Sequence, residues 1–305
     1  MVRQSTIDAS SKAERRLAMK ARTAKIVAQF VIWSVLIILY VPILTLIAYS
    51  FTESTNIGTW MGFSFGLYRD LFQSEEIMTA LGNTIIIALS SSACSVVLGT
   101  CGAIGAFYSG KKMRAATEAM TEIPVANAEI VIAMSLTVLF VFAGTYIFNG
   151  ANIFSFWTLL IGHVILSLPF VYLSVKPKLQ QMDPALYEAA LDLGCTQRQA
   201  LWKVTMPEIL PGILSGFLLS ITLSLDDFIV TAFTRGAGLL SGEKTIDTLS
   251  TLVQAKIKKG PIPPEMRALT TIIFLVVLAI VILVTVYQNL SKKKTNKHAK
   301  WRKEK

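Results

Sequence analysis

Two neighbouring carboxylates, Asp226 and Asp227, lie inside the apolar stretch LSLDDFIVTAF. An ionised carboxylate at membrane depth is energetically costly, and by default it marks a function or a partner. The stretch contains no lysine or arginine that could neutralise the pair. The simplest functional interpretation is a transport step that selects cations. The alternative is that the pair binds a partner helix or stays hydrated at a wide outer mouth.

A second informative segment, MDPALYEAALDLGCTQRQALWKVTMPEILPGI, lies between two apolar runs. Its local signals predict two short helices joined by a glycine turn, in a position to contact another protein. The signals are Asp183 as an N-cap before Pro184, Gly194 as a left-handed C-terminal cap, the capping box of Thr196 and Gln199, and Pro207 and Pro211, which we expect to end the second helix.

No pattern in the chain indicates covalent catalysis, a metal or a cofactor. The three cysteines, at 94, 101 and 195, lack the spacing of zinc ligands or of a disulfide framework. The stretch from Gly105 to Lys111 matches most of a phosphate-binding loop motif. That motif requires serine or threonine as the next residue, to bind Mg²⁺, and this chain has Lys112 there. Any ATP hydrolysis is therefore expected in a separate chain, and this chain is not expected to be an enzyme.

Packing explains two further features better than chemistry does. Gly99, Gly102 and Gly105 recur within one apolar run, as small residues do where membrane helices approach closely. His163 lies in another apolar run, and we expect it to make hydrogen bonds within the packed helices.

Membrane-spanning helices must position these motifs. The chain has 305 residues, of which 53% are hydrophobic and only 16% charged, and its mean hydropathy is +0.57. A span needs about 20 mostly apolar residues. We therefore expect an all-α integral membrane protein with six transmembrane helices, at 26–51, 80–108, 125–148, 156–175, 212–233 and 268–287.

Basic residues predict the orientation of the chain. Of the 29 lysines and arginines, 22 lie in four segments and seven in the alternate loops. The four segments are 1–25, 109–117, 176–211 and 288–305. Both termini and the loop at about 176–211 are therefore expected in the cytoplasm, and the loop at about 234–267 outside.

The expected organisation is a basic N-terminal segment at 1–25, a six-helix transmembrane domain at 26–289 and a basic tail at 290–305. The net charge of +10 is concentrated beside apolar runs, as in juxtamembrane anchors, so membrane lipid rather than nucleic acid is the expected partner. In the outer loop, apolar residues from Ile246 to Ile257 recur at helical spacing, which predicts a short amphipathic helix on the membrane.

The segment between the fourth and fifth spans resembles the EAA loop of ABC-importer permeases. That loop reads Glu-Ala-Ala, three residues, glycine, nine residues, isoleucine, any residue, leucine-proline. The matching positions are Glu188, Ala189, Ala190, Gly194, Val204, Met206 and Pro207, with valine and methionine in place of isoleucine and leucine. The resemblance implies a type I, MetI-like permease fold in the cell membrane, whose loop docks as a coupling helix on a separate ATP-binding subunit.

Two other segments, LSLDDF at 223–228 and PPEMRALTTI at 263–272, resemble the C-type permeases of spermidine/putrescine importers. The resemblance implies a polyamine substrate, a second permease, two ATP-binding subunits and an extracytoplasmic solute-binding protein. The loop at 234–267 is our candidate docking site for that protein. The alternatives are a permease for another solute, such as iron, an amino acid or sulfate, and an autonomous channel or secondary transporter.

Overall fold

The computed structural model describes residues 2–54, 58–236, 245–259, 263–279, 282 and 286. Its regular elements are helices: α1 (Val2–Tyr49), α2 (Gly66–Gln73), α3 (Glu75–Tyr108), α4 (Lys111–Ala126), α5 (Glu129–Tyr146), α6 (Phe156–Gln181), α7 (Pro184–Asp192), α8 (Gln197–Ala200), the π-helix η1 (Leu201–Thr205), α9 (Met206–Asp226), α10 (Ile229–Thr234) and α11 (Leu249–Lys259). Residues 265–279 are also helical.

Five helices among the described residues are long and apolar enough to cross a membrane. They are Lys25–Tyr49, Glu75–Tyr108, Glu129–Tyr146, Phe156–Gln181 and Gln197–Asp226. They correspond to the first five predicted spans. The sixth, at 268–287, is helical from 268 to 279 and at 282 and 286, and its other residues lie outside the described part of the chain.

The third predicted span, 125–148, was placed too early in the chain. Residues up to Ala126 belong to α4, and the backbone leaves the helix at Asn127 before α5 begins at Glu129. Pro124 lies in the last turn of α4, where its missing N–H leaves one carbonyl without its helical partner and favours an end to the helix.

The fifth predicted span, 212–233, differs from the structure at both ends. Pro207 and Pro211 do not end a helix, because α8, η1 and α9 run on as one apolar helix. The π-turn makes this possible: Met206 N–H bonds to the carbonyl of Leu201, five residues back, so the ladder widens just before the first proline. At the other end α9 stops at Asp226, and the separate helix α10 follows.

The chain forms two compact units, residues 1–73 with 263–305, and residues 74–262. In the first unit, Arg267 Nη1 donates a hydrogen bond to the carbonyl of Ser54 at 2.9 Å, which joins the last described helix to the segment after α1. The rings of Phe51 and Phe63 stack there at 5.2 Å between centroids.

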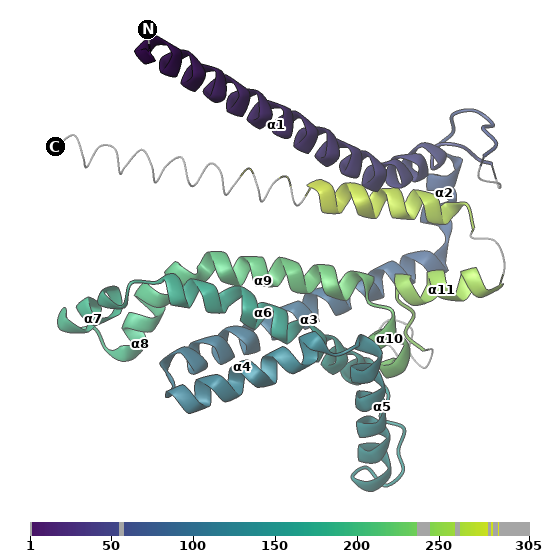
Figure 1. Ribbon diagram of the computed structural model, residues 1–305. Helices are drawn as coiled ribbons and strands as arrows, with labels where there is room; N and C mark the ends of the chain where they lie inside the picture. Colours follow the sequence, from purple (N-terminus) through teal and green to yellow (C-terminus); the bar gives the residue numbers. More distant parts are fainter. Residues whose placement is uncertain are drawn as a thin grey trace. The chain divides into compact units, whose positions relative to one another are not determined.

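The second unit is built on α3, α6 and α9, which lie side by side (Figure 1). Val171 of α6 is fully buried at the centre of this bundle. Glycines from both neighbours face it: a Cβ on Gly99 of α3 would lie 2.9 Å from the Val171 side chain, and one on Gly216 of α9 would lie 3.2 Å from its Cα. Small residues on either side therefore allow the three backbones to approach closely.

The remaining helices of this unit surround the bundle. In Figure 1, α5 points away from α3, α6 and α9, and α10 packs against α5 and α6. The amphipathic helix expected from the outer loop forms as α11; the start of its apolar side packs against protein, whereas Ile257 near its end is exposed. Ile246, Leu249 and Leu252 are buried, and Leu249 N–H bonds to Thr84 Oγ1 of α3 at 2.9 Å.

Replacement of Gly99 by alanine tests the close approach of α3 to α6. The new methyl group would lie 2.9 Å from Val171 Cβ, so the helices must shift, at a cost of about 1–3 kcal/mol. We expect a lower thermal midpoint for purified Gly99→Ala in detergent. The matched control is Gly105→Ala, also on α3, whose methyl group would meet nothing within 4 Å. Equal midpoints for the two variants would contradict the packing argument.

Candidate functional site

In the segment from Asp183 to Thr205, here called the coupling loop, the predicted caps and the glycine turn form, but the second predicted short helix is the start of the longer helix that runs through η1 into α9. Asp183 Oδ1 accepts a hydrogen bond from Ala185 N–H at 3.0 Å, which caps α7 ahead of Pro184 at its first turn. After α7, Gly194 has a φ of 86°, a value that glycine adopts without steric strain. The N–H of Gly194 then bonds to Leu191 O at 2.9 Å.

The turn that follows α7 is a Schellman motif, because Cys195 N–H also bonds to Ala190 O at 3.0 Å. Thr196 and Gln199 then form the reciprocal capping box that starts α8. The turn between α7 and α8 is therefore closed by backbone hydrogen bonds and by the capping box.

The matched EAA positions divide into exposed and inward-facing residues. Glu188, Ala189, Gly194 and Pro207 are exposed and are available to a partner. Ala190 is buried, and Val204 and Met206 are partly buried; Met206 packs against the core between α3, α6 and α9. The loop thus combines an internal apolar support with an accessible Glu-Ala edge.

Three exposed apolar residues of this loop were missed by the sequence analysis. Leu193 is 87% exposed, Trp202 is 64% exposed and Leu186 is about half exposed. Leu186, Ala189 and Leu193 recur at i, i+3 and i+7, so they share one face of α7. This spacing was a usable signal. Large apolar side chains that are exposed close together on one loop are candidates for a protein-binding surface.

An ion-pair network ties α4 to α6 in the turns of α6 that lead to the coupling loop. Glu118 of α4 contacts Lys176 Nζ at 3.0 Å and Arg114 Nε at 3.1 Å. The hydrogen bond from Lys176, with that from Arg114, holds the pKa of Glu118 below its ordinary value. These contacts fix α4 beside the end of α6 from which α7 continues.

At the far end of α9, Asp227 lies at the break between α9 and α10 rather than inside one helix. Its side chain is only 5% exposed. Oδ1 accepts from Val230 N–H at 3.2 Å, and Oδ2 accepts from Thr231 N–H at 2.8 Å and from Thr231 Oγ1 at 2.9 Å. The carboxylate therefore caps the free N–H groups at the start of α10.

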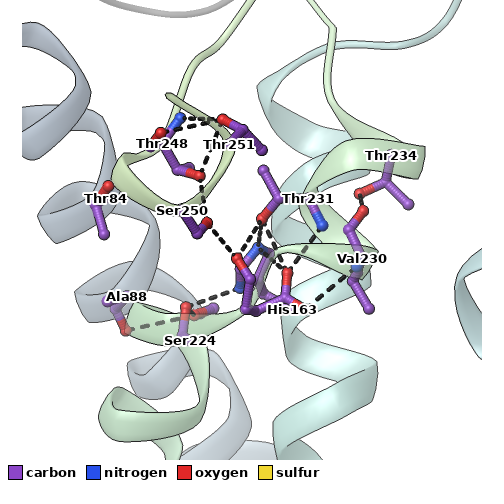
Figure 2. Close-up of polar contacts among 12 residues, drawn as sticks. Thr84, Ala88, His163, Ser224, Val230, Thr231, Thr234, Thr248, Ser250 and Thr251 are labelled. Atoms are coloured by element: carbon purple, nitrogen blue, oxygen red, sulfur yellow. Dashed lines mark hydrogen bonds and ion pairs between the residues drawn. The ribbon is translucent and has the colours of Figure 1, made fainter. Parts of the chain in front are cut away.

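His163 of α6 is completely buried beside this cap. Figure 2 shows it reaching Ser224 and Thr231, with 2.8 Å from Nδ1 to Ser224 Oγ and 2.9 Å from Nε2 to Thr231 Oγ1. Nε2 also lies 3.5 Å from Asp227 Oδ2. The expected role of His163 as a hydrogen-bonded packing residue is confirmed, and the residue links α6 to both helices at the break.

Two more contacts extend the network to other elements. Ser91 of α3 donates to Ser224 Oγ at 3.3 Å, and Ser250 at the start of α11 donates to the carbonyl of Asp227 at 2.6 Å. Five helices, α3, α6, α9, α10 and α11, thus meet around one carboxylate.

Asp226 has the opposite environment, because its side chain is exposed. None of the ion pairs formed by the described residues includes it. Glu129, the first residue of α5, interacts electrostatically with both aspartates, so three carboxylates gather at this point. Within the described residues no group of three histidine, cysteine or carboxylate side chains is arranged to hold a metal ion.

Comparisons with known proteins show which family this chain resembles. Residues 95–297 match the family model described as binding-protein-dependent transport system inner membrane component. The chain is 32% identical to the spermidine/putrescine transport system permease protein PotC of Haemophilus influenzae over 245 residues, which are 80% of this chain and 90% of that protein. It is also 32% identical to the putrescine transport system permease protein PotI of Escherichia coli over 236 residues, 77% of this chain and 81% of that protein.

A solved structure shares the fold. A chain in the crystal structure of a bacterial ABC transporter involved in the import of the acidic polysaccharide alginate superposes with a TM-score of 0.63. The match covers 88% of this chain and 96% of that chain at 16% identity, which supports the fold alone.

The two neighbouring aspartates predict opposite responses to the same substitution. In Asp227→Asn one acceptor oxygen becomes an amide donor, so at least one buried N–H or hydroxyl at the start of α10 loses its partner, at a cost of about 1–3 kcal/mol. Asp226→Asn changes an exposed group and is expected to alter stability by less than about 0.5 kcal/mol. Thermal unfolding of the purified variants measures both. Similar losses in the two variants would show that Asp227 is not the cap described.

Proposed function

This chain belongs to the family of binding-protein-dependent transport system inner membrane components, and from that premise we propose that it is the permease subunit of an ATP-driven polyamine importer. The observation that carries the proposal is the identity of about one third to two polyamine permeases over some four fifths of the chain. Spermidine and putrescine are flexible polycations, and the exposed carboxylate of Asp226 beside Glu129 supplies the charge that such a substrate requires.

The exposure of the two aspartates supports a division of labour between them. Asp226 faces the pathway and attracts the cation, whereas Asp227 holds the helix break in place. Both were predicted to line the pathway. The hydrogen bonds that occupy Asp227 favour Asp226 as the residue that meets the substrate.

The coupling loop supports the second half of the proposal, which is contact with a separate ATP-binding subunit. Glu188, Ala189 and Gly194 supply an open edge, and Leu193 and Trp202 supply apolar area for a groove on the partner. ATP-driven closure of two such subunits would displace α7 and open the bundle outward. The polyamine, released by an extracytoplasmic solute-binding protein docked at 234–267, would then enter past Asp226.

The complete assembly holds a second, homologous permease, because one chain supplies half of the pathway. The chain lies in the cell membrane with segments 1–25 and 290–305 in the cytoplasm, on the same side as the coupling loop. The surplus of basic residues in these parts supports that orientation. ATP hydrolysis belongs to the partner chains.

Uptake by the complete complex in liposomes tests the polyamine assignment. We expect ATP-dependent uptake of spermidine or putrescine by the wild type. Asp226→Asn should lower uptake at subsaturating substrate roughly tenfold, because a hydrogen bond to a charged group contributes about 1.5–3 kcal/mol. Asp70→Asn, at an exposed carboxylate of α2, is the matched control. ATP hydrolysis by an assembled complex that moves neither polyamine would refute the substrate assignment.

Co-purification tests the docking surface. Leu193→Asp places a charge at the most exposed leucine of the coupling loop, and loss of a buried leucine contact is worth about 1.5–3 kcal/mol. We expect the variant to retain its thermal midpoint but to bind the ATP-binding subunits roughly tenfold more weakly. The control is Met113→Asp, an exposed methionine of α4. Unchanged binding by Leu193→Asp would place the docking surface elsewhere.

A further inference from the structure

Helix α7 is joined to the transmembrane bundle by two covalent connections, and in neither of them does a helix run on unbroken from α7. On the α6 side, the helix ends at Gln181, and Met182 and Asp183 have extended backbone with ψ values of 134° and 117°. On the α9 side, α7 is followed by the Gly194 turn and then by α8 and η1. A displacement of α7 that is transmitted through the covalent chain must pass one of these two connections before it reaches the bundle.

The connection to α9 is weakened further by its hydrogen-bond pattern. In η1 the bond from Met206 N–H reaches back five residues to Leu201 O, and neither Pro207 nor Pro211 has an N–H to donate. A wide turn with missing ladder bonds bends more readily than a regular α-helix. Part of any movement of α7 would therefore be absorbed here before it reached α9.

A direct side-chain contact bypasses both connections. Tyr108 is the last residue of α3, and its ring centroid lies 5.3 Å from that of Tyr187 in α7, with 43° between the ring planes. Its hydroxyl lies 3.4 Å from Oγ1 of Thr205, a fully buried residue at the end of η1. The ring of Phe107 packs edge to face against that of Tyr108, with ring centroids 5.1 Å apart. The end of α3 thus contacts the coupling helix and the π-turn at once.

Helix α3 is well suited to carry a displacement from this end. It has 34 residues without an internal proline and packs along both α6 and α9. The 17 residues from Tyr108 back to Ser91 span about 26 Å at 1.5 Å per residue. Ser91 bonds to Ser224 in the network around Asp227. One uninterrupted helix therefore links the coupling loop to the carboxylate cluster.

We propose that Tyr108 is a positioning residue that transmits the movement of the coupling helix α7 sideways into α3, in parallel with the covalent route into α9. The inference rests on the proposed function as an ATP-coupled permease. Two aromatic rings in contact resist compression, because repulsion between their atoms rises steeply at short distance. The route through η1 can bend instead. Tyr108 therefore sets how much of each ATP-driven stroke reaches the pathway.

The test compares Tyr108→Ala with Tyr108→Phe in the complete complex in liposomes. Uptake and ATP hydrolysis are measured on the same preparation, and the result is their ratio. Tyr108→Ala should lower polyamine moved per ATP roughly fivefold or more, the size of a typical coupling between two sites, with ATP hydrolysis unchanged. Tyr108→Phe keeps the ring contact and should retain most of the wild-type ratio of uptake to ATP hydrolysis. Tyr146→Ala, at an exposed tyrosine at the end of α5, should leave it unchanged.

A double-mutant cycle with Tyr187→Ala distinguishes transmission from general damage. If the two tyrosines act through their contact, the double variant should transport no less polyamine per ATP than the more impaired of the two single variants. Retention of the ATP-binding subunits is checked by co-purification. A wild-type ratio in Tyr108→Ala, or additive losses in the double variant, would overturn the inference and leave the proposed function intact. Absence of uptake by the wild-type complex would overturn both.

Discussion

The carboxylate of Asp227 satisfies the backbone groups that a broken helix would otherwise leave unpaired within the bundle. An exposed N–H in a membrane interior lacks water to bond with, so a break between α9 and α10 needs an acceptor fixed at the break itself. Asp227 provides two oxygens for three donors, and His163, Ser224 and Ser250 surround it. The meeting of five helices at this point follows from that requirement, since each contributes a group that completes the network.

The same break explains why two adjacent aspartates have unlike environments. Even in a continuous helix, successive side chains point about 100° apart, so one aspartate can face the pathway while the other pairs laterally. Here the backbone leaves the helix at Asp227, whose ψ is 124°. Its side chain turns towards α10, while Asp226 remains on the exposed end of α9. A buried carboxyl group is thus used for structure, and its exposed neighbour stays available to a cation.

The caps and the glycine turn of the coupling loop could be predicted because they depend on residues close together in the sequence. The break between α9 and α10 could not, because it depends on tertiary contacts. Asp183, Gly194, Thr196 and Gln199 act on residues within a few positions of themselves, so their effect is visible in the sequence. His163 forms hydrogen bonds with Ser224 and Thr231, which lie 61 and 68 residues further along the sequence, and no local sequence pattern predicts such contacts. The prolines at 207 and 211 misled for a related reason: they would end a regular α-helix, but a π-turn accommodates them. The exposed face of Leu186, Ala189 and Leu193 was detectable by spacing alone.

Close packing between α3, α6 and α9 determines how the two sites can influence one another. Gly99 and Gly216 both lie against Val171, where a larger residue at either position would meet it at about 3 Å, so the three helices are closely packed here. A tightly packed interface of this kind favours movement of the helices as a body over gradual deformation. The coupling loop contacts the bundle at the end of α3, and the Asp227 network contacts α3 again at Ser91. If α3 transmits movement as proposed, displacement at the first contact reaches the second, where Ser91 bonds to Ser224 near the end of α9.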